Sequence, residues 1–284
     1  MPSAPAQTRV MSEPVILTDM PAPHVARITL NRPDKRNALN HPLRGAILDQ
    51  LRRNDQDPDV RVTIIRGAGS CFSAGYELGD GNIGEEMPFY TPGGDGQWPR
   101  HVTEGWMSIW DLAKPVIAQV HGYCLAGGSE LATGCDLVFI AEDAQMGYPA
   151  VRFGVGDMHF HAWFVGMRRA MEMMITGDSL TGTEAAELGW ANRAFPADQL
   201  EAEVLEVAGR VALVEPELVQ MNKRVVHRQM EIMGMRTGIR QGTELCALGT
   251  HARAMQTFIG KARSEGLRNA LQERDAPFGD YRTS

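Results

Sequence analysis

The sequence lacks several features that would assign it to a class of protein at once. Its 284 residues include only four cysteines, none in a Cys-x-x-Cys pair, so neither a zinc site nor a disulfide framework is indicated. No apolar run is long enough to cross a bilayer, and residues 1–23 lack the charged-then-apolar order of a signal peptide. We therefore expect a cytoplasmic protein without membrane association, with buried thiols at least at Cys124 and Cys135.

Positive charge is also scarce. The chain has 28 basic and 35 acidic residues and a net charge of −7, which argues against nucleic-acid binding. An anionic ligand would then need a local basic patch, which Arg32, Lys35 and Arg36 supply. Hydrophobic residues make up 43% of the chain, enough for one large domain or for a domain with a helical appendage.

Strand and helix patterns alternate along the chain. Short β-branched runs predict strands, and apolar residues at helical spacing predict helices. The predicted strands are residues 24–30, 60–65, 116–120 and 137–141, and the main predicted helices are residues 39–51, 101–112, 162–175, 200–213 and 218–233. Because a strand–helix–strand order implies a right-handed crossover, we predict an α/β fold with a parallel sheet and a helical C-terminal region.

One stretch combines a strand, a glycine turn and a helix opening. Gly127 and Gly128 follow the predicted strand at residues 116–120, and as glycines they permit positive φ and close approach of a ligand. We expect Ser129 near the helix N-cap and Glu130 in the first turn, where the free amides would stabilise an anionic oxygen. The alternative is purely structural, because Gly-Gly turns are common and the helix dipole favours a first-turn glutamate without any catalytic role.

Three further segments repeat or extend this pattern. They are Ser73-Ala74-Gly75-Tyr76 after a strand, the turn Asn31-Arg32-Pro33-Asp34-Lys35-Arg36-Asn37-Ala38-Leu39, and the run at residues 185–192. Together with the Gly-Gly turn, they resemble the crotonase superfamily, the enoyl-CoA hydratase/isomerase family, from about residue 24 to about residue 270. The resemblance implies a ClpP-like spiral of ββα units over residues 1–200, with residues 1–23 partly flexible. It also implies an α-helical trimerisation region over residues 201–284 and a homotrimer or hexamer.

The resemblance also implies a chemistry. Such enzymes bind an acyl-CoA thioester and stabilise negative charge on its carbonyl oxygen with two backbone amides. Here the donors would be the amides of Tyr76 and Gly127, so the side chain at Tyr76 would be free to vary. Coenzyme A would enter only as part of the substrate, with no permanently bound cofactor and no metal. Its contacts would come from Arg36, Ala38, Ser73 and Ala74.

The acid–base pair departs from the hydratase pattern. Glu130 matches the first of the family's two glutamates, but Ala150 stands where the second is expected. Asp157 is the substitute that the resemblance suggests, and a carboxylate pair would raise one of the two pKa values. Alternatively, Asp157 has a purely structural role as the N-cap of the following helix. His159 and His161 are possible bases.

These departures leave three hypotheses about the function open. The first is proton transfer on a thioester enolate, by hydration or isomerisation, with Glu130 as acid/base and Asp157 assisting. The second is a crotonase-type hydrolase or carbon–carbon lyase that uses His159 or His161. The third is a catalytically silent acyl-CoA-binding protein, which Ala150 favours. The glycine- and proline-rich residues 79–100 either line the acyl pocket, with Met87, Phe89, Tyr90 and Trp98 as walls, or form a mobile surface loop.

Overall fold

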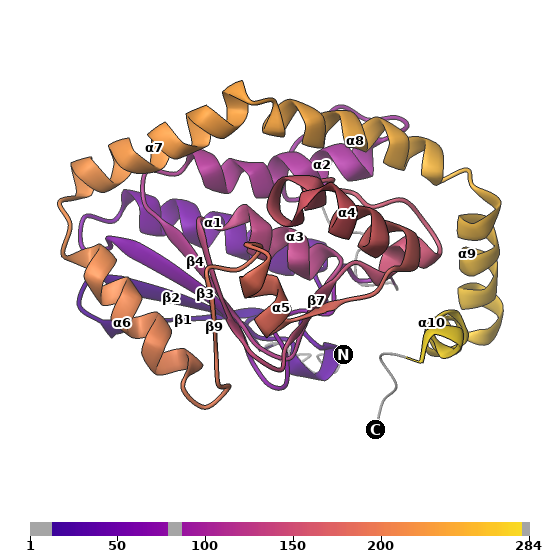
Figure 1. Ribbon diagram of the computed structural model, residues 1–284, viewed down its shortest axis with the longest axis horizontal. Helices are drawn as coiled ribbons and strands as arrows, with labels where there is room; N and C mark the ends of the chain where they lie inside the picture. The colour runs from indigo at the N-terminus through magenta and orange to yellow at the C-terminus, as the bar shows by residue number, and fades with distance from the viewer. Residues whose placement is uncertain (1–12, 79–86, 280–284) are drawn as a thin grey trace, which may run out of the picture.

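A six-stranded sheet forms the centre of the protein (Figure 1). The computed structural model describes residues 13–78 and 87–279. The strand order is β1-β2-β3-β4-β6-β9, with β1 antiparallel to β2 and every other neighbouring pair parallel. These strands are β1 (Ile16–Ala22), β2 (Val25–Leu30), β3 (Val62–Gly67), β4 (Val116–Val120), β6 (Leu137–Ala141) and β9 (Arg193–Phe195). The predicted α/β class is therefore confirmed.

A smaller sheet and the helices complete the architecture. The small sheet pairs β5 (Tyr123–Leu125), β7 (Gln145–Gly147) and β8 (Leu180–Thr181) in that order. The helices are α1 (His41–Gln56), α2 (Gln97–Met107), α3 (Gly127–Gly134), α4 (His161–Thr176), α5 (Gly182–Glu187), α6 (Leu200–Ala212), α7 (Pro216–Ile232), α8 (Met235–Gly249), α9 (Arg253–Glu265) and α10 (Leu267–Asp275). None of the helices in the described part of the chain is long and apolar enough to cross a membrane.

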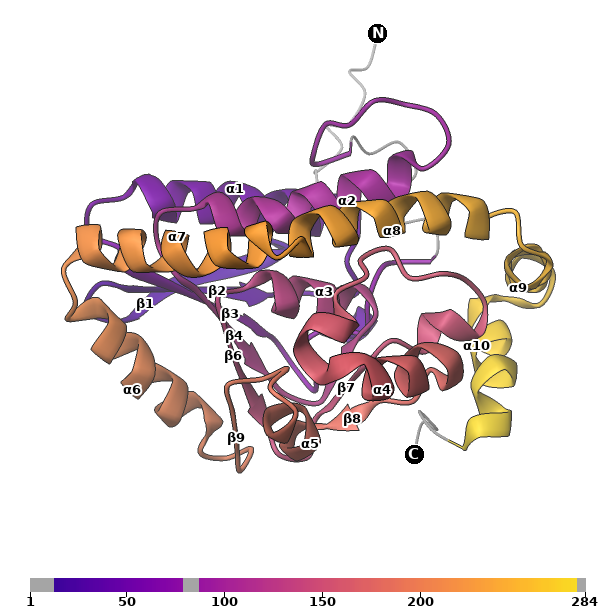
Figure 2. The ribbon, with the colours of Figure 1, turned by 45° about the horizontal axis from the view of Figure 1, so that its top comes forward.

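Helices α1 and α6 cover opposite faces of the large sheet (Figure 2). α1 begins after Asn40, whose side chain accepts a hydrogen bond from the Leu43 amide at 3.0 Å, and Pro42 occupies the first turn, where no donor is needed. The apolar stripe of α1, which includes Leu43, Ile47 and Leu51, is buried. α6 contacts all six strands of the large sheet, so the core is a helix–sheet–helix sandwich.

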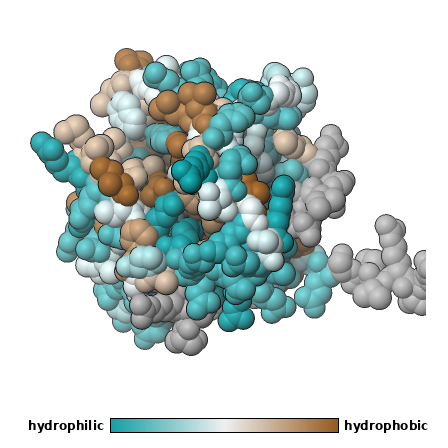
Figure 3. Space-filling view, turned by 90° about the vertical axis from the view of Figure 1, so that its right-hand side faces the viewer, coloured by the Kyte–Doolittle hydropathy of each residue, from teal (hydrophilic) through white to brown (hydrophobic). Residues whose placement is uncertain are grey.

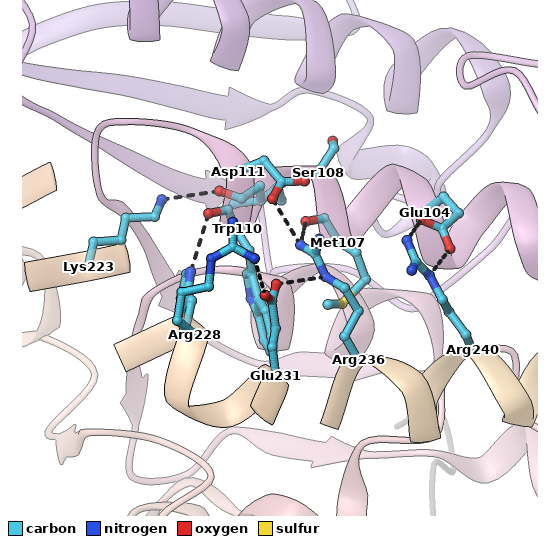
Figure 4. A network of polar contacts seen from close by, with 12 residues as sticks. Glu104, Met107, Ser108, Trp110, Asp111, Lys223, Arg228, Glu231, Arg236 and Arg240 are labelled. Carbon is cyan, nitrogen blue, oxygen red and sulfur yellow. Dashed lines mark hydrogen bonds and ion pairs between the residues drawn. The ribbon is translucent and has the colours of Figure 1, made fainter. Parts of the chain in front are cut away.

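The C-terminal helices lie against the outside of this core. α8 lies beside α2, and ion pairs join them, as Figure 4 shows. Arg240 donates to both oxygens of Glu104 in α2 at 2.6 and 2.7 Å, and Arg236 donates at 3.1 Å to Asp111, in the 3₁₀ turn (Ser108–Asp111) that follows α2. α9 and α10 close one end of the molecule, where hydrophobic residues form separate groups on a mostly hydrophilic surface (Figure 3).

Several elements differ from the sequence-based prediction. Residues 16–22, within the segment expected to be partly flexible, form the edge strand β1, whereas residues 1–12 lie outside the described part. Helix α2 begins at Gln97 rather than at residue 101, because Gly96 adopts a left-handed φ of 76° that starts the helix earlier. Of the predicted loop at residues 79–100, residues 79–86 lie outside the described part. All four cysteines are buried and free, as predicted for Cys124 and Cys135.

Candidate functional site

The two glycine turns that the sequence singled out are in contact. A Cβ atom on Gly75 would lie 3.4 Å from the Gly127 nitrogen, and a Cβ on Gly127 would lie 2.7 Å from the ring of Tyr76. Neither the Tyr76 nor the Gly127 amide donates a hydrogen bond to another described residue. The structure thus brings together the two segments that carry the predicted amide donors, and only glycine fits at the point of contact.

The turn that precedes α3 differs from the sequence-based expectation in its φ angle and its N-cap. The left-handed φ of 48° falls on Ala126, and Gly127 already begins helix α3. Ser129 is therefore inside the helix, where its hydroxyl donates to the Ala126 carbonyl at 2.7 Å, and is not the N-cap. Gly128 is required for close packing, because a Cβ there would lie 2.6 Å from the Ser73 carbonyl oxygen. Glu130 lies in the first turn of α3, as expected.

Glu130 is a fully buried carboxyl with three hydrogen-bond donors. The hydroxyl of Tyr148 donates to Oε1 at 2.7 Å, and the Met158 amide donates to the same oxygen at 3.0 Å. The hydroxyl of Tyr76 donates to Oε2 and itself accepts a hydrogen bond from Trp106 Nε1 at 2.9 Å. The Tyr76 side chain therefore belongs to the site, contrary to the expectation that it is free to vary.

Asp157 lies in the same cluster and is partly buried. Its backbone amide donates to the Tyr148 hydroxyl at 3.1 Å, so Tyr148 connects the Asp157 backbone to Glu130. Its carboxylate accepts hydrogen bonds from the Cys246 thiol of α8, at 3.2 Å, and from the Trp98 side chain. It does not cap the following helix, because the N-cap residue of α4 is Phe160. The C-terminal helices thus contribute to the cover of the site.

The two carboxyl groups have raised pKa values. Burial, and then the negative charge of Asp157, raise the pKa of Glu130 to about 8 against the opposing effect of its three donors. Burial raises the pKa of Asp157 to about 6, and the donors Cys246 and Trp98 limit this rise. Both carboxyls are therefore shifted toward neutral pH, and the negative charge of one favours the protonated form of the other.

Ala150 and the two histidines are not part of the hydrogen-bonded cluster around Glu130 and Asp157 within the described residues. Ala150 lies in a 3₁₀ turn (Pro149–Arg152) directly after Tyr148, and its methyl group cannot transfer a proton. The ring of His161 is buried between Phe160 and Trp190, and burial lowers its pKa to about 3. His159 packs against Gly242 of α8. Neither histidine is hydrogen-bonded to Glu130 or Asp157 within the described residues.

The predicted coenzyme A segment folds as one unit around Asn37. The Asn37 side chain donates to the carbonyls of Ala68 and Cys71, at 2.9 Å each, which fixes the turn at residues 32–38 against the turn at residues 68–74. The Ala74 amide donates to the Arg36 carbonyl at 3.0 Å. These contacts bring Arg36, Ala38, Ser73 and Ala74 together. Arg36 is exposed, with its guanidinium over the Tyr123 ring at 5.7 Å, whereas the Ser73 hydroxyl is buried and donates to the Asn37 carbonyl at 2.9 Å.

Aromatic side chains close the site. Glu130 has no exposed surface, and the rings of Tyr76 and Trp98 meet edge to face, 5.2 Å apart, beside it. Of the residues predicted to wall the acyl pocket, Trp98 meets the site, whereas Tyr90 is 86% exposed. Met87 lines a hollow of about 660 Å³ on the outer side of α1, away from Glu130.

Comparisons with known proteins give consistent matches. A model of the Enoyl-CoA hydratase/isomerase family matches residues 22–280. A Dictyostelium discoideum protein named as a probable mitochondrial enoyl-CoA hydratase is 31% identical over 245 residues, which cover 84% of this chain and 85% of the relative. The crystal structure of an enoyl-CoA hydratase/isomerase from Xanthobacter autotrophicus Py2 has a TM-score of 0.84 at 36% identity, covering 93% of this chain and 98% of the other. The crystal structure of an enoyl-CoA hydratase from Mycobacterium smegmatis has a TM-score of 0.85 at 31% identity, covering 94% of this chain and 96% of the other.

Proposed function

Because the chain belongs to the enoyl-CoA hydratase/isomerase family, we propose that it transfers protons on the enolate of an acyl-CoA thioester, with Glu130 as acid/base and Asp157 assisting. The observation that carries this proposal is the environment of Glu130. A buried carboxyl that is held by three donors and whose pKa is raised by a second carboxyl is suited to general acid–base catalysis.

We assign the thioester carbonyl oxygen to the amides of Tyr76 and Gly127. The contact between the two turns supports this assignment, as do the lack of any other acceptor among the described residues and the position of Gly127 at the start of α3. Two donors aimed at this oxygen would stabilise the negative charge that develops there. Coenzyme A would lie along the Arg36, Ala38 and Ala74 segment, with Arg36 as the exposed cation for a phosphate.

A singly protonated pair fits the proton balance of hydration. When water adds to the double bond of a 2-enoyl thioester, the water loses a proton as its oxygen bonds to Cβ, and Cα gains a proton. Ionised Asp157 would take the first proton, and protonated Glu130 would supply the second. Isomerisation needs only that a proton is removed from one carbon and returned to another, which one carboxyl of the pair can do.

Product analysis in H₂¹⁸O tests this proposal. We expect wild-type protein to convert a 2-enoyl-CoA into an ¹⁸O-labelled 3-hydroxyacyl-CoA, or to convert a 3-enoyl-CoA into the 2-enoyl isomer without label. Release of free coenzyme A thiol as the main product would instead identify a hydrolase. Binding of coenzyme A without any turnover would favour the catalytically silent alternative, for which Ala150 is the specific observation.

The pair also predicts a bell-shaped pH dependence of kcat/KM. The active form needs Asp157 ionised and Glu130 protonated, so activity should rise near pH 6 and fall near pH 8. In Asp157→Asn the acidic limb should disappear. The alkaline limb should move to lower pH, because a neighbouring negative charge that raises the pKa of Glu130 is removed. An alkaline limb that stays in place or moves upward in this variant would contradict the assignment.

We propose in addition that the protein forms a homotrimer or hexamer through its helical C-terminal region. Exposed apolar side chains on α7 support this, among them Leu218, Met221, Val225 and Val226, each 51–58% exposed. Light scattering should give a mass of three or six times 31.2 kDa, and a monomer at micromolar concentration would contradict the proposal. The cytoplasmic location expected from the sequence stays a prediction.

A further inference from the structure

Arg44 is a buried cation that the proposed mechanism does not use. It lies in the second turn of α1 and has no exposed surface. Its guanidinium is enclosed by the rings of Tyr76, Trp98 and Trp106, at 5.3–5.6 Å from the ring centroids. Such contacts stabilise a cation partly, but they do not replace the hydrogen bonds that a buried guanidinium loses when it leaves water.

The hydrogen bonds of Arg44 are incomplete. Nη1 contacts His101 Nε2 at 2.8 Å, where burial and the Arg44 charge lower the pKa of His101 to about 3, so the neutral ring can accept. Nε and Nη2 are buried without a hydrogen-bond partner among the described residues, and within that same part of the chain Arg44 forms no ion pair. Buried polar groups are rarely left unpaired, so these two nitrogens indicate that Arg44 binds a ligand.

The unpaired nitrogens define the shape of the ligand group. Nε and Nη2 share one edge of the planar guanidinium, and this edge matches the two oxygens of a carboxylate in a bidentate pair. Nη2 lies beside Gly105 of α2, where an added Cβ would be in van der Waals contact with it at 3.7 Å. A lysine would offer a point charge and not this flat, two-donor edge.

The position of Arg44 connects it to the proposed reaction site. The Tyr76 hydroxyl donates to Glu130, and the Tyr76 ring lies against Arg44. In the same way, the Trp98 side chain donates to Asp157, and its ring lies against Arg44. The same two rings therefore separate the guanidinium from both carboxyls. Glu130 and Arg44 both have no exposed surface, so an acyl group must open this cluster of side chains to reach either of them.

We propose that Arg44 binds a carboxylate at the far end of the acyl group, so that the substrate is the coenzyme A thioester of a dicarboxylic acid. This inference rests on the proposed function, since it extends the same site. The thioester end of the acyl group lies at the two glycine turns, its reacting carbons lie at Glu130, and its terminal carboxylate pairs with the Nε–Nη2 edge of Arg44. A buried charge-assisted pair of this kind contributes specificity because a neutral acyl end leaves Arg44 unpaired.

A matched pair of thioesters tests the proposal. The probes are two six-carbon 2-enoyl-CoAs, one ending in a methyl group and one in a carboxylate, together with their saturated counterparts for binding by calorimetry. We expect wild-type protein to prefer the carboxylate probe by about 10- to 100-fold in kcat/KM and in affinity, the range for a hydrogen-bonded charge. In Arg44→Met this preference should vanish, because the loss of kcat/KM falls mainly on the carboxylate probe. Arg44→Lys should retain part of the preference. Arg52→Met, which removes an exposed arginine of the same helix, should change nothing.

The outcomes are distinguishable. Equal use of both probes by wild-type protein, or a preference for the methyl probe, would overturn the proposal. An Arg44→Met variant that loses activity on both probes to the same degree would also overturn it, because Arg44 would then act as a general counter-ion to Glu130 and Asp157. If Arg44→Met does not fold, the proposal is tested by the preference of wild-type protein for the carboxylate probe and by the partial preference expected in Arg44→Lys. If no thioester is turned over, the proposed function fails, while the affinities for the saturated pair still test the role of Arg44.

Discussion

Replacing Glu130 with Gln should lower kcat/KM for enoyl-CoA substrates by about 10²- to 10⁴-fold, the usual contribution of a positioned general acid or base. Glutamine keeps a carbonyl oxygen that can accept from Tyr148 and from the Met158 amide, so the two bonds at Oε1 are preserved. Its amide can donate to the Tyr76 hydroxyl. The substitution therefore removes the exchangeable proton and leaves the packing of the site intact. Initial rates on the substrate identified by product analysis measure the effect.

Two controls make this prediction specific. Affinity for coenzyme A should be unchanged in Glu130→Gln, because the coenzyme segment around Asn37 does not contact Glu130. Glu187→Gln, at an exposed position in α5, should retain wild-type activity. A Glu130→Gln variant that turns over substrate at the wild-type rate would remove Glu130 from the mechanism and with it the proposed assignment of the pair.

The parts of the fold that the sequence predicted are those with strong local patterns. The limits of β4 and β6 coincide with the predicted strands, because both are short apolar segments that are covered on both faces. Strands β5 and β7 were not predicted, since each has three residues and depends on pairing with strands that are distant along the chain. Helix α3 ends at Gly134, before the predicted strand at residues 137–141.

The site was predicted only where a motif marked it. The resemblance to the crotonase superfamily identified the turns at Gly75 and Gly127 together with Glu130, and the comparisons confirm the family. Tyr148 and Trp98 were not assigned to the carboxyl pair, because their contacts depend on tertiary packing. Arg44 was missed for the same reason. It lies between apolar positions of α1, where a sequence pattern predicts an exposed charge, and only α2 and the Tyr76 turn bury it.

A buried ion pair joins α7 to the core, and His227 of the same helix lies 3.2 Å from the other oxygen of the aspartate. Lys223 donates to Asp136 at 2.9 Å and to the carbonyls of Ile109 and Lys114 at 3.1 Å, so all three of its protons are used. Asp136 also accepts from the Val116 amide of β4 at 2.7 Å. The lysine and aspartate side chains are only 5% and 11% exposed, so water does little to screen the pair. It therefore links α7 directly to the end of the central sheet.

Lys223→Met should lower the free energy of unfolding by about 3–5 kcal/mol, because it removes the lysine cation from a buried aspartate. The remaining neighbour of Asp136 on α7 is the ring of His227, 3.2 Å away. Urea denaturation measures the loss. In the double variant with Asp136→Asn the two losses should not add, since removal of both charges also removes the cost of the unpaired one. Arg228→Met is the matched control, because its pair with Glu231 is 78% exposed on the arginine side and should contribute less than about 1 kcal/mol. A loss of less than about 1 kcal/mol in Lys223→Met would show that the apolar contacts of α7 and α8 hold the helical region in place without this pair.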